Sequence, residues 1–250
     1  MSAFTAELIG TMMLILFGNG VVANVVLART KGNDAGWIVI AAGWGIAVFV
    51  GAFCANEFSG AHLNPAVTVA MVVGGNLSLV DAGGYIAAQF IGAIVGAVLV
   101  YLFYREHFNA TEDADAKLAC FCTSPNIRNS AQAFLCEAIG TFALILPIFL
   151  MATPRLMQDG APADPDTLLG LGSLGLLPVG LLVFGIGLSL GGTTGYAINP
   201  ARDLGPRIVH AVLPIKDKRS NDWGYSWVPV LGPLAGATLA ALLYRFVLSV

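Results

Sequence analysis

Two copies of an Asn-Pro-Ala motif stand in apolar stretches of the chain, and their residues are Asn64, Pro65, Ala66, Asn199, Pro200 and Ala201. Asn is a favoured N-cap and Pro a favoured first helical residue, so each motif predicts a helix start. The apolar run after Asn64 lasts about ten residues, and such a helix is about 15 Å long, half of a membrane. The two asparagine side-chain amides can donate hydrogen bonds to a solute. The two positive helix N-termini repel cations.

The segments before the two motifs, "SGAHL" and "TGYAI", are expected to be non-helical at membrane depth. Unpaired backbone is tolerated there when it lines a water-filled path. The sequence therefore implies a pore with one wall of backbone carbonyls, supplied by Gly60, Ala61, His62, Leu63, Gly195, Tyr196, Ala197 and Ile198. The simpler interpretation, that each Asn-Pro pair caps an ordinary helix, is disfavoured because the two copies occupy matched positions of a repeat.

The composition indicates a membrane protein. Of the 250 residues 57% are hydrophobic and 11% are charged, whereas soluble domains carry about 25% charged residues. The net charge of −3 argues against a nucleic-acid partner. No cofactor or metal site is expected, because Cys120 and Cys122 lie in a polar loop without further ligands nearby, and Cys54 and Cys136 lie in apolar stretches.

Six segments are long and apolar enough, or nearly so, to cross a membrane. The expected fold is an all-α membrane protein with six transmembrane helices and two re-entrant half-helices, in one channel domain over residues 1–250. The expected spans are roughly 3–27, 37–54, 82–104, 131–152, 171–190 and 226–248.

The second half of the chain resembles the first. "AELIGTMMLIL", which contains Glu7, is similar to "CEAIGTFALIL", which contains Glu137. Each half has two spans, an Asn-Pro segment and a third span, so the halves enter the membrane from opposite sides. This predicts an inverted repeat, with halves at about 1–106 and 131–250 and a site near the midplane. Small residues four apart predict close helix packing; they are Gly92, Gly96, Gly232 and Gly236.

These motifs, together with Glu7 and Glu137, resemble the aquaporin superfamily of major intrinsic proteins. The resemblance covers nearly the whole chain. It implies a homotetramer with one pore per subunit, in the cell membrane, with several passes and both termini in the cytoplasm. It also implies that the two glutamates accept hydrogen bonds from the re-entrant loops.

Within that superfamily the chain resembles the glycerol facilitators, because Asp203 directly follows "NPAR". The four positions of the family's selectivity filter map to Trp44, Gly187, Tyr196 and Arg202. Glycine leaves room, arginine binds hydroxyls and repels cations, and the aromatic rings face carbon. Where well-known facilitators have Phe, the hydroxyl of Tyr196 is expected to narrow or hydrate the filter.

The expected function is a passive channel for glycerol and similar small uncharged solutes, with water permeation and exclusion of protons and ions. Its partners are these solutes and the lipid bilayer, and it is not an enzyme. The main alternative is a strict water channel. An intramembrane enzyme using Glu7 and Glu137 and a structural junction protein are further alternatives, and solute flux distinguishes all of them.

The distribution of Lys and Arg disagrees with the topology that the resemblance implies. With the N-terminus inside, the expected inner side carries only Arg155 and Arg245. The expected outer loops carry Arg29, Lys31, Arg105, Lys117, Arg128, Arg207, Lys216, Lys218 and Arg219. The positive-inside rule favours the reverse orientation, but the rule weakens for long loops.

Overall fold

The computed structural model describes residues 1–152, 154–155, 157–158, 161–162 and 169–248. The expected all-α fold is confirmed. In chain order the helices are α1 (Ala3–Val26), α2 (Trp37–Ser59), α3 (Pro65–Gly74), α4 (Leu79–Ala110), α5 (Ala114–Ala119), α6 (Ser130–Leu150), α7 (Leu177–Leu190), α8 (Pro200–Val212) and α9 (Val228–Leu243). A 3-10 turn, η1 (Gly172–Leu176), precedes α7, and a π-helical turn, η2 (Tyr244–Leu248), follows α9. Strands β1 (Met157–Gln158) and β2 (Ala161–Pro162) pair antiparallel.

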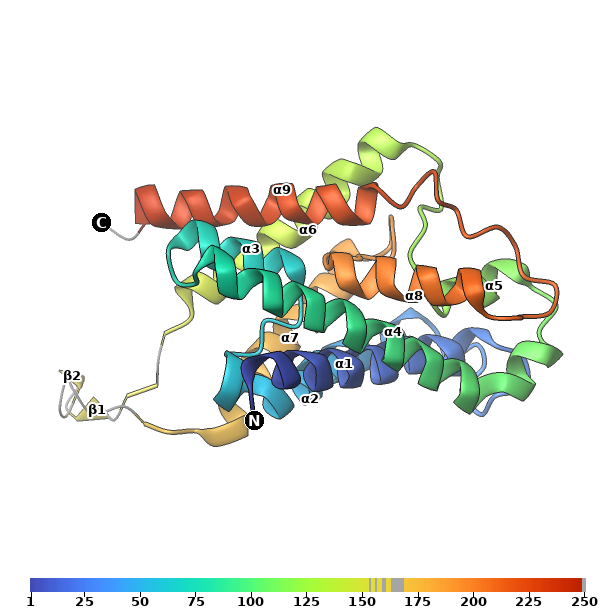
Figure 1. Cartoon of the computed structure of the whole chain (residues 1–250), viewed down its shortest axis with the longest axis horizontal. Helices are drawn as coiled ribbons and strands as arrows, with labels where there is room; N and C mark the ends of the chain where they lie inside the picture. Colours follow the sequence, from blue (N-terminus) through green and yellow to red (C-terminus); the bar gives the residue numbers. More distant parts are fainter. Residues whose placement is uncertain (153, 156, 159–160, 163–168, 249–250) are drawn as a thin grey trace.

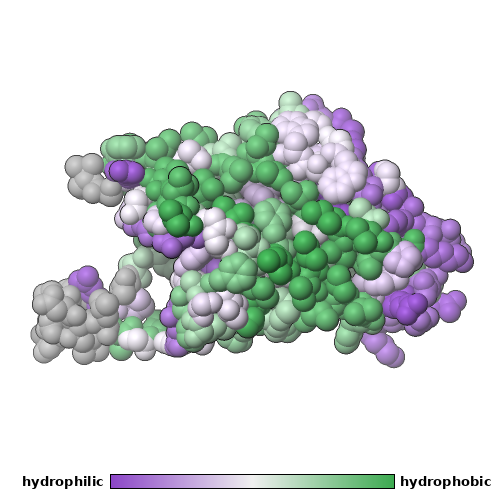
Figure 2. Space-filling model, in the orientation of Figure 1, coloured by the Kyte–Doolittle hydropathy of each residue, from purple (hydrophilic) through white to green (hydrophobic). Residues whose placement is uncertain are grey.

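Six helical segments of the described chain are long and apolar enough to cross a membrane. Large apolar side chains face outward on them, and Val80 and Phe103 are each more than three-quarters exposed. Figure 2 shows these residue types as a broad apolar band, with hydrophilic residues gathered at one end of the molecule. Such a surface is stable against lipid rather than water.

The two half-helices begin where the sequence predicts. The Asn64 side chain accepts a hydrogen bond from the Ala66 amide, and α3 is 10 residues long. The Asn199 side chain accepts from the amides of Ala201 and Arg202, and α8 is 13 residues long. Pro206 lies inside α8 without interrupting it. Each helix spans only part of the bilayer.

The helices pack in a crosswise pattern between the two halves of the chain (Figure 1). Within the halves, α1 packs on α4 and α6 packs on α9. Between the halves, α3 packs on α9, α8 packs on α4, and α2 packs on α7. Each half-helix therefore lies against the last long helix of the other half, and their N-terminal ends meet inside the bundle.

The pairs α1–α4 and α6–α9 approach closely at glycines. A Cβ on Gly92 would lie 2.3 Å from the Leu8 carbonyl oxygen, and one on Gly236 would lie 2.0 Å from that of Ala138. No side chain fits in either place. These contacts hold the long helices around the half-helices.

Candidate functional site

The two Asn-Pro-Ala motifs are joined by reciprocal hydrogen bonds. The Asn64 amide donates to the Ile198 carbonyl at 2.8 Å, and the Asn199 amide donates to the Leu63 carbonyl at 2.9 Å. Two of the eight expected pore carbonyls are thus bound to amides. Each NH₂ group has two N–H donors, and both asparagines line the same cavity. One donor of each remains for a solute.

In the two re-entrant loops, residues 61–64 and 196–199 alternate between left-handed and ordinary backbone, and the glycine before each stretch is left-handed as well. Ala61 and Leu63 have φ of 53° and 52°, and Tyr196 and Ile198 have φ of 37° and 42°. Such conformations cost about 1–3 kcal/mol each in non-glycine residues. Alternation of this kind turns successive N–H groups to one side, where they form a concave anion site. Their carbonyls consequently face the opposite side.

Glu7 occupies the anion site of the first loop. Its carboxylate accepts hydrogen bonds from the amides of His62 at 2.9 Å and Leu63 at 2.7 Å. It also accepts from Ser59 at 2.6 Å and from Gln89 at 2.7 Å. The carboxylate is fully buried, and these four donors compensate its removal from water.

Glu137 occupies the matching site of the second loop. It accepts from the amides of Ala197 at 3.0 Å and Ile198 at 2.8 Å, and from the Thr194 hydroxyl at 2.7 Å. Its carboxylate is buried as well. Both glutamates thus bind backbone amides of the loops, and residues of these loops line the larger cavity described next.

Two cavities lie along this path and share the side chains of Trp44, Tyr196 and Arg202. The larger, of about 350 Å³, is lined by the first loop, both asparagines and an apolar wall that includes Leu14, Val48, Leu144, Ile148 and Val183. The smaller, of about 290 Å³, is lined by Gly195 and by polar residues that include Thr123, Ser124, Asn126 and Thr194. The two cavities adjoin at these three shared residues, which form the junction between them.

Arg202 is held at this junction by two contacts. Its guanidinium carbon lies 4.1 Å from the centre of the Trp44 ring, a cation–π contact. Its Nη1 donates to the Phe121 carbonyl at 3.4 Å. Only 6% of the residue is exposed, and it lines both cavities. A fixed positive charge with further N–H donors therefore borders the passage.

Gly187 lies behind this junction and does not line either of these two cavities. A Cβ on Gly187 would lie 2.9 Å from both Cζ and the hydroxyl oxygen of Tyr196. The room that glycine leaves is thus filled by the Tyr196 ring. The Tyr196 hydroxyl is buried without a hydrogen-bond partner among the described residues, so it faces the wall, contrary to the expectation that it narrows or hydrates the opening.

Asp203 does not line either cavity. Its buried carboxylate forms an ion pair with Arg207 at 2.8 Å, and both side chains are 0% exposed. Arg207 was expected among the outer-loop cations; that expectation is wrong, because Arg207 lies within α8 and its charge is neutralised inside the protein. The spacing of four residues on a helix is the signal that predicts such a pair.

Cys120 and Cys122 lie between α5 and α6, in the segment that the sequence predicts to be a polar loop. Both thiols are free and buried, and burial raises their pKa. Cys122 lines the smaller cavity. Within the described part of the chain, no group of three or more His, Cys, Asp and Glu residues could hold a metal ion.

Opposed half-helices inside six membrane-length helices, with a passage between them, define a membrane channel for small solutes. The chain belongs to the major intrinsic protein family, whose model matches residues 1–244.

Relatives of this chain include proteins named as glycerol uptake facilitators. The chain is 50% identical to a "Probable glycerol uptake facilitator protein" of Thermotoga maritima, over 98% of this chain and 99% of that protein. It is 47% identical to the "Glycerol uptake facilitator protein" of Bacillus subtilis, over 98% and 84% of the two chains. The X-ray structure of the aquaglyceroporin from Plasmodium falciparum matches with a TM-score of 0.81 at 32% identity, over 98% of this chain and 95% of that one.

Proposed function

We propose that this chain is a passive membrane channel for glycerol and similar small uncharged solutes, with water as a second permeant. The observation that carries the proposal is the junction of the two cavities, where Arg202 lies beside Trp44 and Tyr196. A linear polyol has a hydroxyl edge and a carbon edge. The guanidinium donates hydrogen bonds to the first, and the rings present apolar surface to the second.

The other site residues complete the passage. The free carbonyls of the two loops accept hydrogen bonds from solute hydroxyls, while the apolar wall of the larger cavity faces the carbon edge. Asn64 and Asn199 each offer one N–H donor where the loops meet. Gly187 acts indirectly, since it provides the space into which Tyr196 packs.

Protons and cations are excluded by the positive potential around the two asparagines and Arg202. The positive ends of α3 and α8 both begin at the asparagines, and the charge of Arg202 adds to their potential. An enzymatic role for Glu7 and Glu137 finds no support, because each carboxylate already accepts several hydrogen bonds from its loop.

For the whole molecule we propose one channel domain made of two inverted repeats, about 1–106 and 131–250, that assembles as a homotetramer in the bilayer. The crosswise contacts α3–α9 and α8–α4 support the repeat. The apolar band of Figure 2 supplies the surface for lipid and for neighbouring subunits.

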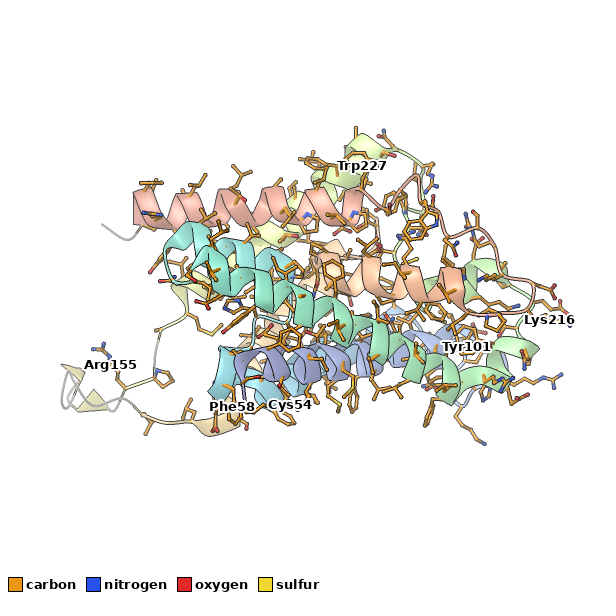
Figure 3. The ribbon with its side chains drawn as sticks, viewed as in Figure 1. Cys54, Phe58, Tyr101, Arg155, Lys216 and Trp227 are labelled. Carbon is orange, nitrogen blue, oxygen red and sulfur yellow. The ribbon has the colours of Figure 1, made fainter. Side chains whose placement is uncertain are left out.

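We further propose that both termini lie in the cytoplasm. The start of α1 and the end of α9 lie toward one end of the molecule in Figure 1, and Figure 3 shows Arg155 at that end and Lys216 at the other. Three of the cations that oppose this orientation have their charges engaged within the protein: Arg207 pairs with Asp203, Lys117 donates to the Lys216 carbonyl, and Lys218 donates to the last carbonyls of α8. The disagreement with the positive-inside rule is therefore smaller than the sequence suggests.

The test is stopped-flow light scattering of proteoliposomes that contain the purified protein. We expect a glycerol gradient to equilibrate at least about tenfold faster than in empty liposomes, since a barrier reduction of ~1.4 kcal/mol is sufficient for this. The Arg202→Val variant should admit protons that the wild type excludes, measured with an entrapped pH dye. Water flux without glycerol flux would identify a strict water channel, and no flux of either solute would refute the proposal.

A further inference from the structure

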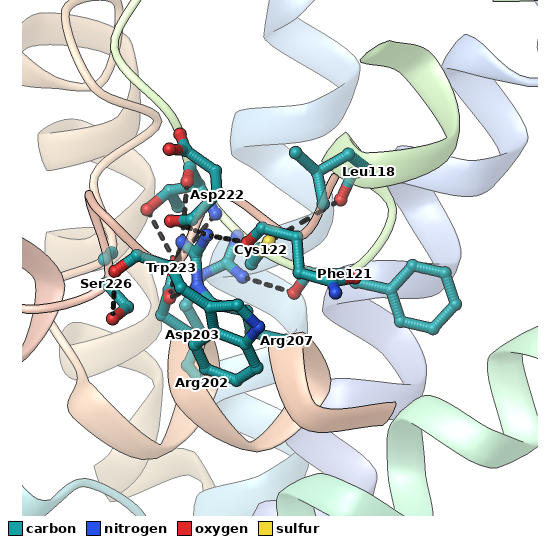
Figure 4. Close-up of polar contacts among 12 residues, drawn as sticks. Leu118, Phe121, Cys122, Arg202, Asp203, Arg207, Asp222, Trp223 and Ser226 are labelled. Carbon is teal, nitrogen blue, oxygen red and sulfur yellow. Dashed lines mark hydrogen bonds and ion pairs between the residues drawn. The ribbon is translucent and has the colours of Figure 1, made fainter. Parts of the chain in front are cut away.

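The orientation of Arg202 depends on a short segment, residues 121–123, that follows α5. The Phe121 carbonyl of this segment accepts hydrogen bonds from Arg202 Nη1 at 3.4 Å and from Asn19 Nδ2 at 3.5 Å. Figure 4 shows the segment beside the first turns of α8. The Phe121 carbonyl is therefore the hydrogen-bond acceptor that orients the Arg202 guanidinium.

The segment is held in place at its other end by Asp203. The backbone amide of Thr123 donates to Asp203 Oδ2 at 2.7 Å, and the Thr123 hydroxyl donates to the same oxygen at 2.8 Å. Arg207 Nη2 donates to the Thr123 carbonyl at 2.9 Å. All three polar groups of Thr123 are thus bound by the Asp203–Arg207 pair.

The ion pair is in turn connected to the loop before α9. Arg207 Nη1 donates to the carbonyls of Asn221 at 2.7 Å and Asp222 at 3.2 Å. A buried pair of charges is costly, and it is tolerated when its remaining donors and acceptors are satisfied, as they are here. The pair therefore connects α8, the 121–123 segment and the loop before α9.

We propose that Asp203 is a positioning residue for solute selection. It does not touch the solute; it fixes Thr123, and thereby the Phe121 carbonyl that aims Arg202 across the junction of the cavities. This inference rests on the proposed glycerol function. Glycerol binds through its hydroxyls only when the guanidinium has one particular orientation. The passage of a water molecule depends less on that orientation.

The test compares glycerol and water permeability of the same proteoliposomes for the wild type and Asp203→Asn. After the permeability of empty liposomes is subtracted, the ratio of the two permeabilities is independent of how much folded protein is present, so a mere loss of folded protein does not change it. We expect the glycerol-to-water ratio to fall roughly fivefold, the factor that one net hydrogen bond contributes. An unchanged ratio would overturn the proposal.

Arg128→Gln is the matched control. Arg128 pairs with Asp222 in the same group of loops, but its side chain is 55% exposed and it does not contact the 121–123 segment through any hydrogen bond or ion pair described for it. Its loss should leave the ratio as in the wild type. If the glycerol-to-water permeability ratio fell as much in Arg128→Gln as in Asp203→Asn, the cause would be a general loosening of the loops, and the proposal would be refuted.

If Asp203→Asn fails to fold, Thr123→Val decides the question. Valine keeps the shape of threonine and removes the hydroxyl bond to Asp203, while the backbone amide bond remains and still holds the segment. The ratio should therefore fall by less than for Asp203→Asn, about twofold. An unchanged ratio in this variant would refute the positioning role. Absence of glycerol flux in the wild type would instead refute the proposed function, so the two failures are distinguishable.

Discussion

Arg202 carries a full charge in the first turn of a half-helix, which is an unfavourable place for a cation because the helix end is itself positive. Three neighbours compensate it. Trp44 offers the face of its ring and Phe121 its carbonyl, while Asp203 places a negative charge in the same turn. The site thus keeps an intramembrane charge whose cost is at least ~2.5 kcal/mol when uncompensated.

We expect the hydroxyl of Tyr196 to contribute little to solute selection. Because it is buried without a partner, Tyr196→Phe should leave the glycerol-to-water permeability ratio unchanged within about twofold and should not lower the thermal stability, since an unsatisfied buried hydroxyl costs ~1–3 kcal/mol. Stopped-flow permeability and melting in detergent check this.

Tyr85→Phe serves as the control for this prediction. The Tyr85 hydroxyl donates to the Ser59 carbonyl at 2.9 Å, so its removal should lower the melting temperature. If Tyr196→Phe changed the permeability ratio about fivefold or more, an effect as large as a net hydrogen bond, the hydroxyl would have to lie in the solute path.

At the scale of elements, the long helices depend on glycines at their crossing points. Gly236→Ala would force a methyl group to within 2.0 Å of the Ala138 carbonyl oxygen, and overpacking of this kind costs about 1–3 kcal/mol or more. We expect a lower melting temperature in detergent and a smaller yield of folded protein.

Gly83→Ala is the matched control, because Gly83 also lies in a membrane-length helix but has open space where a Cβ would be. There alanine should stabilise the helix slightly, by up to about 1 kcal/mol. Equal melting temperatures for the two variants would show that the close approach of α6 and α9 is not needed.

Local patterns in the sequence predict most of these elements. Hydropathy predicts the six spans, and the Asn-Pro pairs predict α3 and α8 because N-cap and first-turn preferences are local. Glu7 and Glu137 occupy equivalent positions of the two repeats, so the sequence predicts the same role for both. The course of the 121–123 segment was not predictable, since its contacts with Asp203 and Arg202 join residues about 80 positions apart.

Two site residues show why the remaining details could not be predicted. The space at Gly187 is visible in the sequence, but its filling by Tyr196 depends on how the second loop enters the bundle. The sequence places Arg207 among the cations of the outer loops, although it follows Asn199 by only eight residues. The structure instead continues α8 through Val212 and buries the charge.

At the scale of the whole molecule, the orientation in the membrane is open to direct measurement. We expect a fluorescent protein fused to the C-terminus to be bright, because it matures only in the cytoplasm, and a reporter inserted between α4 and α5 to be dark. The reverse pattern would show that the positive-inside rule prevails over the family topology. Because a passive pore conducts both ways, this outcome would leave the proposed function intact.

The wall of backbone carbonyls that we propose has a consequence for how such a channel changes over time. Every amino acid brings the same peptide oxygen, so point mutations along the two loops leave this half of the lining chemically constant as long as Glu7 and Glu137 hold the backbone. New solute preferences can therefore arise only at two kinds of position. These are the residues whose side chains border the path and the residues that hold those side chains in place. The molecule combines an invariant half with an adjustable one.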